Sequence, residues 1–341
     1  MRKTTIGLAA IAALGLALTA CSSPAQTAAP ATTGAAPATS AAAPATSAPA
    51  AGKPYIAIIS KGFQHQFWQA VKLGAEQQAA KDNVDITFEG PATEADVEDQ
   101  LNMLTAALAK KPAAIGFAAL DSKAAGPTLD QIKAQNIPVI AFDSGVASDI
   151  PLTTVATDNK AAAAEAGKHM CDLIGGSGTV GVIVHDQTSV TGQDRRDGFT
   201  AYMKDKCSGA KLLEVQYGGG DQTKSADIAK AMITANPDIK GIFGANEGSA
   251  VGALKGIQES NKAGKIVLIG FDSGKAQLDA IRSGVMAGAV TQDPIGMGAG
   301  TVAAAVKAIK GETLPKSIPS GYMWFDKTNM DNPEIKAVLY E

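Results

Sequence analysis

From Lys53 onward the chain alternates short apolar runs with segments of helical periodicity, and this alternation most constrains its fold. The apolar runs predict buried strands at 55–59, 84–88, 114–118, 139–142, 180–184, 212–216, 241–243 and 266–269. Continuous apolar strands that alternate with amphipathic helices are typical of parallel sheets covered by helices on both faces. The sequence therefore predicts an α/β protein with doubly wound parallel sheets.

The clearest helix is predicted by apolar residues at steps of four, three and four from Val97 to Leu108. Thr93 is predicted to cap this helix. Glu94 is assigned to an acidic cluster at the helix start, and two lysines follow its end, as the helix dipole favours.

A short internal repeat links two parts of the chain. The segment 139–145 (VIAFDSG) recurs as 267–274 (VLIGFDSG), and in each copy an aspartate, Asp143 or Asp272, directly follows the apolar run. These aspartates are predicted at the carboxyl ends of parallel strands, where open α/β sheets place ligands. The repeat predicts two similar lobes that face each other across a cleft.

The first residues read as an export signal. Arg2 and Lys3 precede an apolar run at 6–20, and Cys21 follows small residues directly. This pattern resembles the lipobox of bacterial lipoproteins, in which the cysteine becomes the lipidated first residue of the mature chain. We expect a signal peptide at 1–20 and an anchor at Cys21, on the outer face of the cytoplasmic membrane. The alternative is an ordinary cleaved signal with a chance cysteine.

Composition excludes several classes of function. Residues 21–52 are almost entirely Ala, Pro, Thr and Ser and predict a disordered tether. The whole chain has 30 basic and 33 acidic residues, a balance that argues against a nucleic-acid partner. Three cysteines and three histidines are too few for a Cys/His metal cage, and we expect no metal and no cofactor. The string 176–181 matches a dinucleotide-binding fingerprint but precedes its strand, so it cannot present a helix start to a pyrophosphate.

An ordered set of segments resembles the periplasmic sugar-binding proteins of ABC importers, of the ribose- and galactose-binding type. The segments that carry the resemblance are 58–68, 157–159, 195–199, 243–248, 270–272 and 292–294. The resemblance implies a periplasmic binding protein-like fold of type I. It places one lobe at 53–157 plus 293–319 and the other at 158–292 plus 320–341. Three hinge segments are expected near Thr157, Asp293 and 318–320.

The resemblance and the residue chemistry together give a predicted ligand site. Phe67 and Trp68 match the family's stacking pair, and the alternative is that both only pack their helix. His65, Asn246 and Gln292 are predicted to hydrogen-bond hydroxyls, and the alternative for His65 is an exposed loop position. Asp143 and Asp272 can each accept two hydroxyl bonds, or else cap a helix, and Arg195 offers a donor fork. By contrast, Arg196 is expected to face solvent, and Glu247 is assigned only the cap of its own helix.

Two departures from the family pattern bear on the ligand. Ser144 stands where the ribose-binding pattern has arginine, and Gly218–Asp221 replaces the second lobe's usual aromatic residue. A single arginine between two acids does not favour an anion. We therefore expect a small neutral sugar or polyol, with pentitols, tetritols or pentoses favoured over hexopyranoses.

Cys171 and Cys207 are predicted to form a disulfide. Both belong to the expected second lobe, on helices that flank one strand. An exported domain lies in an oxidising environment, where disulfides form. Free buried thiols are the alternative.

The function predicted is that of a monomeric, non-enzymatic binding protein that delivers its solute to ABC permease subunits, with the membrane contacted only through the lipid. One rival is a sensor that presents the ligand to a signalling receptor. Another is a lipid-anchored glycoside hydrolase that uses Asp143 and Asp272 as its carboxylate pair. A repressor of the same fold is disfavoured because no DNA-binding helical head precedes Lys53.

Overall fold

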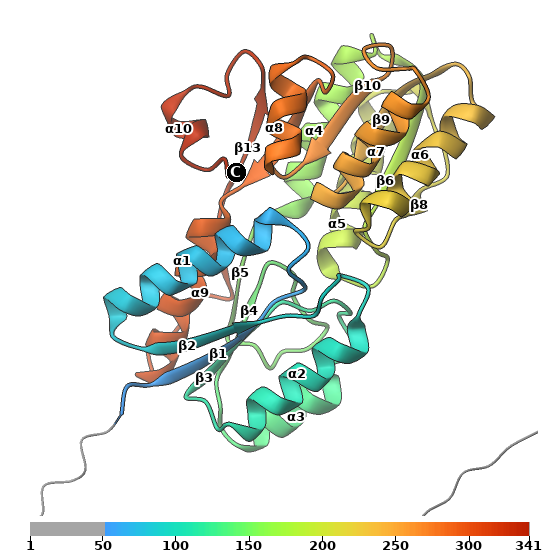
Figure 1. Ribbon diagram of the computed structural model, residues 1–341. Helices are drawn as coiled ribbons and strands as arrows, with labels where there is room; N and C mark the ends of the chain where they lie inside the picture. Colours follow the sequence, from blue (N-terminus) through green and yellow to red (C-terminus); the bar gives the residue numbers. More distant parts are fainter. Residues whose placement is uncertain (1–51, 341) are drawn as a thin grey trace, which may run out of the picture. The chain divides into compact units, whose positions relative to one another are not determined.

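Two parallel sheets organise the computed structural model, which describes residues 52–340 (Figure 1). The predicted signal peptide, the lipidation site Cys21 and the tether up to residue 51 lie outside the described residues. The two-lobed, parallel-sheet α/β fold predicted from the sequence is confirmed.

The sheet of the first lobe has six parallel strands in the order β12-β5-β4-β3-β1-β2. Its strands are β1 (Tyr55–Ile59), β2 (Asp85–Glu89), β3 (Ala114–Phe117), β4 (Val139–Phe142), β5 (Thr153–Ala156) and β12 (Ser317–Pro319). Its helices are α1 (Gln66–Asp82), α2 (Val97–Ala109), α3 (Gly126–Ala134) and α9 (Pro294–Ile309).

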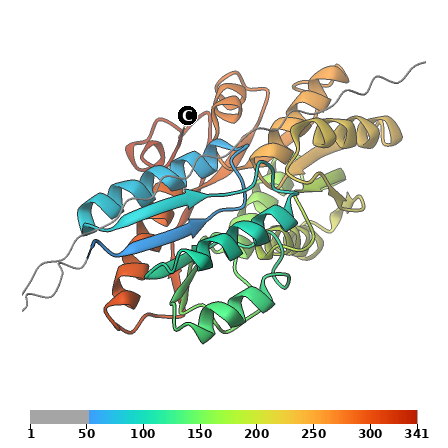
Figure 2. The ribbon, with the colours of Figure 1, turned by 60° about the horizontal axis from the view of Figure 1, so that its bottom comes forward.

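Alternate residues of each central strand point into two different cores. Ile56 and Ile58 pack with α1 and α9, whereas Ala57 and Ile59 pack with α2 and α3. Figures 1 and 2 show these helix pairs on opposite faces of the sheet. Helices α1 and α9 pack closely because they carry glycines: a Cβ on Gly74 would lie 2.0 Å from the carbonyl oxygen of Ile295. Burial on both faces explains the continuous apolar runs of the sequence.

The sheet of the second lobe has seven strands in the order β13-β11-β10-β9-β6-β7, with the short β8 also paired to β6. Its strands are β6 (Ser177–Val184), β7 (Gly209–Leu212), β8 (Gln216–Tyr217), β9 (Ile239–Gly244), β10 (Val267–Phe271), β11 (Gly288–Gln292) and β13 (Tyr322–Asp326). Its helices are α4 (Asn159–Leu173), α5 (Val190–Lys206), α6 (Gln222–Ala235), α7 (Glu247–Glu259), α8 (Lys275–Arg282) and α10 (Pro333–Lys336). Only β13 runs antiparallel to its neighbour, β11.

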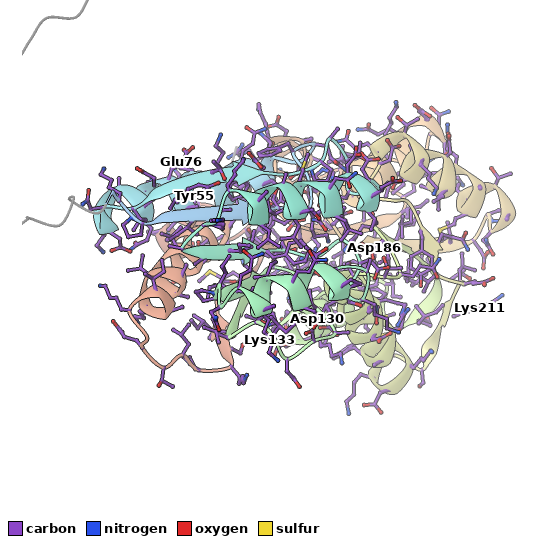
Figure 3. The ribbon with its side chains drawn as sticks, turned by 90° about the horizontal axis from the view of Figure 1, so that it is seen from below. Tyr55, Glu76, Asp130, Lys133, Asp186 and Lys211 are labelled. Carbon is purple, nitrogen blue, oxygen red and sulfur yellow. A yellow bond between two sulfur atoms is a disulfide. The ribbon has the colours of Figure 1, made fainter. Side chains whose placement is uncertain are left out.

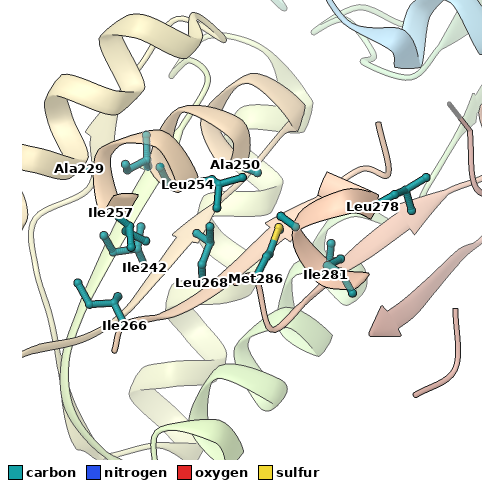
Figure 4. Packing of buried hydrophobic residues seen from close by; sticks show 14 of the residues in the cluster. Ala229, Ile242, Ala250, Leu254, Ile257, Ile266, Leu268, Leu278, Ile281 and Met286 are labelled. Atoms are coloured by element: carbon teal, nitrogen blue, oxygen red, sulfur yellow. The ribbon is translucent and has the colours of Figure 1, made fainter. Parts of the chain in front are cut away.

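Helices also cover both faces of this second sheet. Helices α4 and α5 pack on one face through a cluster that includes Phe199 and Phe243. Figure 4 shows the opposite face, where Ile242 and Leu268 of the sheet meet Leu254 and Ile281 from the covering helices. Charged residues lie outside these cores: Asp130 and Lys133, for example, are exposed on α3 of the first lobe (Figure 3).

Three segments cross between the two sheets: the links from β5 to α4, from β11 to α9 and from β12 to β13. Thr157, in the first link, ties them together. Its hydroxyl donates to Gln292 Oε1 at 2.9 Å and to the carbonyl of Gly321 at 3.2 Å.

Two local predictions are wrong. The apolar stretch 212–216 is not one strand, because the chain leaves the sheet after Leu212 and β8 returns only at Gln216. The N-cap position of α2 is Asp96 and not Thr93, and no side chain caps the helix; the Thr93 hydroxyl instead donates to Asp96 Oδ2 at 2.7 Å. The helix therefore starts three residues later than predicted, and this releases Glu94 from the helix start.

Helices α4 and α5 are joined by a disulfide between Cys171 and Cys207, whose Cα atoms lie 5.8 Å apart. Across residues 52–340, none of the helices has the length and apolar character needed to cross a membrane.

Candidate functional site

The two copies of the internal repeat share an unusual backbone conformation. Asp143 follows β4 with φ 52°, and Asp272 follows β10 with φ 80°. The left-handed region is costly for residues other than glycine, and Asp is among those that tolerate it best. Each backbone N–H is held by the neighbouring strand, Asp143 by Val155 and Asp272 by Val290. The repeat therefore encodes a sharp turn that aims each carboxylate at the cleft.

A small cavity lies between the strand ends of the two lobes. Its volume is about 20 Å³, and it is lined by Lys61, His65, Phe67, Trp68, Glu94, Asp143, His185, Thr191, Arg195, Asn246, Asp272 and Gln292. The structure thus brings all eight predicted ligand-site residues around one cavity. Its volume is enough for about one water molecule, so a sugar-sized solute enters only if the lobes move apart.

Arg195 is held rigidly in the second lobe. Its Nε donates to Asn159 Oδ1 at 2.8 Å, and its Nη1 donates to the carbonyl of Ala245 at 2.9 Å. The guanidinium carbon lies 3.7 Å from the centre of the Phe271 ring, a cation–π arrangement. These contacts use part of the donor fork and leave the remaining N–H groups for the cavity, where Asp272 is 4.0 Å from Nη1.

Asp272 is also held by donors of its own lobe. Gln292 Nε2 donates to Oδ1 at 2.6 Å, and the backbone N–H of Glu247 donates to Oδ2 at 2.9 Å. Asn246 caps α7 through the N–H of Ser249 and points its Nδ2 at Glu94 Oε2, 3.2 Å away in the other lobe. The acceptors and donors of this half of the cavity are thus fixed before any solute arrives.

Phe67 and Trp68 fit both interpretations that the sequence left open, packing in the core and a place at the ligand site. Both rings are buried in the first-lobe core, with 4% and 1% of their surface exposed, and both also line the cavity. Their rings meet edge to face at 4.9 Å. The Trp68 indole N–H donates to Glu94 Oε1 at 2.8 Å, so the core and the polar wall are connected.

Four cavity residues were missed by the sequence reasoning: Lys61, Glu94, His185 and Thr191. Lys61 Nζ donates to Thr191 Oγ1 at 3.1 Å, which joins the lobes. The interpretation of Glu94 as a helix-start residue is wrong, because it is buried in the cavity wall. The view of a single arginine between two acids is likewise corrected to two cations, Lys61 and Arg195, among three carboxylates. A usable signal for Lys61 existed, since it follows β1 at the same sheet edge as Asp143.

Comparison with known proteins adds to this geometry. Residues 56–313 match the model of the periplasmic binding protein domain. The chain belongs to the periplasmic binding protein family. A D-allose-binding periplasmic protein of Escherichia coli (strain K12) is 28% identical over 268 residues, which cover 76% of this chain and 86% of that protein.

Two solved structures extend the likeness. An ABC transporter solute-binding protein of Agrobacterium vitis with bound D-fucose is 34% identical, covers 84% of this chain and 100% of its own, and superposes with a TM-score of 0.81. A carbohydrate transporter solute-binding protein of Agrobacterium radiobacter in complex with D-arabinose is 32% identical, covers 84% of this chain and 99% of its own, and also has a TM-score of 0.81.

Burial and charge set the ionisation of the cavity in this family member. Burial would raise the pKa of Glu94, but the charge of Lys61, the histidines and the Trp68 hydrogen bond together lower that pKa to about 2. Burial raises the pKa of Asp143 to about 6, against the opposing pull of Lys61 and Arg195. Burial, with Lys61 nearby, lowers the pKa of His185 to about 3, so its imidazole is neutral at pH 7.

The cavity also has unused hydrogen-bonding atoms. Both ring nitrogens of His65 are buried without a hydrogen-bond partner, and so is Nδ1 of His185. The nearest acid to His65 is Glu94, at 3.8 Å from Nε2. Buried polar atoms in native proteins are normally paired. These atoms, together with the carboxylates, present donors and acceptors of the kind that hydroxyl groups satisfy.

Helix ends close the cleft by capping each other across the lobes. The N-cap residue of α1, His65, provides no side-chain cap; instead the Glu247 carboxylate of the second lobe accepts from the N–H groups of Gln66 and Phe67 at 3.1 and 3.2 Å. In return, Gln66 Oε1 accepts from the N–H of Lys275, the first residue of α8, at 2.7 Å. The sequence interpretation of Glu247 as a cap of its own helix did not foresee this contact.

Proposed function

We propose that the protein captures a small neutral sugar or polyol between its lobes and delivers it to an ABC importer. The observation that carries this proposal is the polar inter-lobe cavity at the facing strand ends, with two cations among three carboxylates and several unpaired donors and acceptors. Mixed donors and acceptors with nearly balanced charge suit hydroxyl groups and disfavour a strongly charged solute. The sugars named for the related binding proteins support the same class.

Ligand binding is proposed to work by closure of the lobes. The first lobe spans 53–157 and 293–319, the second spans 158–292 and 320–341, and the segments near Thr157, Asp293 and 318–320 act as the hinge. Burial of the cavity and its small volume support this, because a solute held there contacts both lobes and cannot enter between them when closed. Within this class we favour pentitols, tetritols and pentoses over hexopyranoses.

Delivery at the membrane completes the proposal. The signal at 1–20 would export the chain, and lipidation at Cys21 would hold the monomer beside the permease on the outer face of the membrane. Mass spectrometry of the N-terminus from the native host tests this step. A diacylated cysteine is expected, and a mature chain that begins elsewhere would refute the anchor.

Calorimetric titration with pentoses, hexoses and alditols of four to six carbons tests the ligand class. Saturable binding of at least one of them is expected, with no turnover on aryl glycosides. Binding that is tight only for an amino acid, a nucleotide or a charged acid would overturn the proposed function. Turnover would favour the hydrolase reading.

A further inference from the structure

A second, larger cavity adjoins the small one described above. Its volume is about 430 Å³, and it is lined by Gln64, His65, Thr93, Ala95, Gly218, Gly219, Gly220, Asp221, Gln222 and Lys224. Residues 64–95 of this lining belong to the first lobe and residues 218–224 to the second. We call this space the outer cavity and the 20 Å³ space the inner cavity. The outer cavity falls within the size range of small-molecule sites.

His65 is the wall that the two cavities share. Only 2% of its surface is exposed, and neither ring nitrogen has a hydrogen-bond partner. Gln64 Oε1, also in the outer wall, is likewise buried and unpaired. The His65 side chain lies between the two cavities and has unused hydrogen-bonding capacity. This arrangement favours a solute that extends from one cavity to the other past His65.

Glycines of the second lobe make room for the outer cavity. A Cβ on Gly219 would meet nothing within 4 Å, whereas one on Gly220 would lie 3.0 Å from Glu94 Oε2 and 3.3 Å from His65 Nε2. The glycine loop thus touches the inner-cavity residues on one side and leaves open space on the other. Any large side chain at 219 would fill that space.

The chemistry of the outer wall selects a flexible polar chain over a second ring. Apart from the imidazole of His65, the lining offers no aromatic face on which a sugar ring could stack. It offers instead a hydroxyl, amides, the backbone of three glycines and one charge of each sign, Asp221 and Lys224. Thr93, Ala95 and Gln222 are exposed, so the outer cavity communicates with solvent.

We propose that the outer cavity is a second subsite that holds the far end of an elongated solute, with a linear polyol as the chemical class. One end of the polyol binds at the inner cavity. The rest of the polyol chain extends past His65 and hydrogen-bonds to the lining of the outer cavity. This proposal rests on the proposed function and adds that the length of the chain, and not only its hydroxyl pattern, determines affinity.

Calorimetry with a series of alditols tests the subsite, taking the best-binding isomer of each length. Affinity for the native protein should rise from tetritols to hexitols by about fivefold or more, as expected for one or two added hydrogen bonds. Ala95→Trp should fill the outer cavity from the first lobe and Gln222→Trp from the second. Each should cancel the gain for hexitols and leave tetritol binding within about twofold. Ala106→Trp, at an exposed position of α2 away from both cavities, is the matched control and should change nothing.

The outcomes separate this proposal from the function beneath it. If pentoses bind tightly but longer alditols gain nothing over tetritols, the function stands and the second subsite is wrong. Equal losses for every solute in both tryptophan variants would also overturn it. If no neutral sugar or polyol binds, the proposed function fails and the subsite fails with it.

Discussion

The two lobes repeat one fold but prepare their cavity groups in different ways. In the second lobe, Asp272 is held by Gln292 and by the Glu247 N–H, and Arg195 by Asn159 and Ala245. In the first lobe, the equivalent Asp143 has the same left-handed turn, but its carboxylate makes no hydrogen bond within the described residues and its pKa is raised by burial to about 6. The same backbone therefore presents one fixed acceptor and one that is easily titrated.

This difference indicates a division of labour between the lobes. A preorganised half lowers the cost of ordering side chains when a solute binds. The unpaired acid of the first lobe can accept a hydrogen bond from a solute hydroxyl, a donor that the protein does not supply. We propose that the second lobe sets the geometry of binding and that the first lobe responds to the solute and to pH.

The largest expected effect concerns the disulfide, which is found only in the second lobe among the described residues. It joins α4 and α5, the helices that carry Asn159 and Arg195. The cysteines are 36 positions apart, so the double variant C171A/C207A should lose about 4 kcal/mol of unfolding free energy in that lobe.

Each lobe contains one of the two tryptophans, so urea unfolding can follow them separately. Trp68→Phe leaves Trp324 to report on the second lobe, and Trp324→Phe leaves Trp68 to report on the first. The cysteine variant should lower the Trp324 midpoint more than the Trp68 midpoint. Equal shifts would mean that the lobes unfold as one unit and that the disulfide does not stabilise the second lobe separately.

The next effect compares the two aspartates of the repeat. Asp272→Ala should weaken solute binding by ~1–3 kcal/mol, because it leaves Gln292 Nε2 and the Glu247 N–H without their buried acceptor and Arg195 without its neighbouring charge. Asp143→Ala should cost less, since no protein donor depends on that carboxylate. Asn variants at both positions tolerate the left-handed turn and control for backbone strain. Calorimetry that gives equal losses would contradict the proposed division of labour.

A smaller effect is expected at the cap that joins the lobes. Glu247→Gln removes the negative charge from the start of α1 and should weaken closure by about 1 kcal/mol, as for other N-cap losses. Apparent affinity should fall about fivefold, and small-angle scattering without solute should show a larger radius of gyration. Glu259→Gln is the control, because Glu259 is exposed at the opposite end of α7, the helix that begins at Glu247. If both variants behave alike, the cap does not hold the lobes together.

Local sequence signals were sufficient for the fold and for the directions of Asp143 and Asp272. The apolar runs dictate buried strands, and a residue that directly follows such a run must lie at the strand's carboxyl edge, where the inner cavity lies. Glu94 shows where this reasoning fails. It sits in an acidic cluster that suits a helix start, and only the shift of the cap to Asp96 frees it for the cavity.

The contacts between lobes could not be read from the sequence at all. Lys61 and Thr191 are 130 positions apart, and Gln66 and Glu247 are 181 apart. Neither pair has a local pattern, because each depends on how the two sheets face each other. Lys61 could have been suspected from its place after β1, but its partner could not.

The smallest expected effect is the pH dependence that Asp143 of the first lobe contributes. Lys61, Arg195, Glu94 and Asp272 are the charged groups that act on Asp143. Its pKa is raised to about 6 from an ordinary 3.8, so the folded chain binds the proton more tightly than the unfolded chain. Taken alone and without solute, Asp143 should therefore make the unfolding free energy rise as pH falls from about 6 towards 4.5. His185 of the second lobe, whose pKa is lowered to about 3, contributes the opposite slope over the same range, so the Asp143 contribution is measured as the difference in pH profile between the native chain and Asp143→Asn. Glu94, whose pKa is lowered to about 2, adds to the opposing slope below about 4.5.

Solute binding should respond with the opposite sign. If solute hydroxyls donate to the ionised Asp143 and restore its ordinary pKa, affinity should fall about fourfold between about pH 7.5 and 5.5. Asp143→Asn should flatten the profile, whereas Asp272→Asn should lower affinity at every pH and, because the Asp272 charge no longer raises the Asp143 pKa, shift the slope to lower pH. Calorimetry across this pH range tests whether Asp143 is the titrating group. A slope that persists in Asp143→Asn would show that another residue titrates.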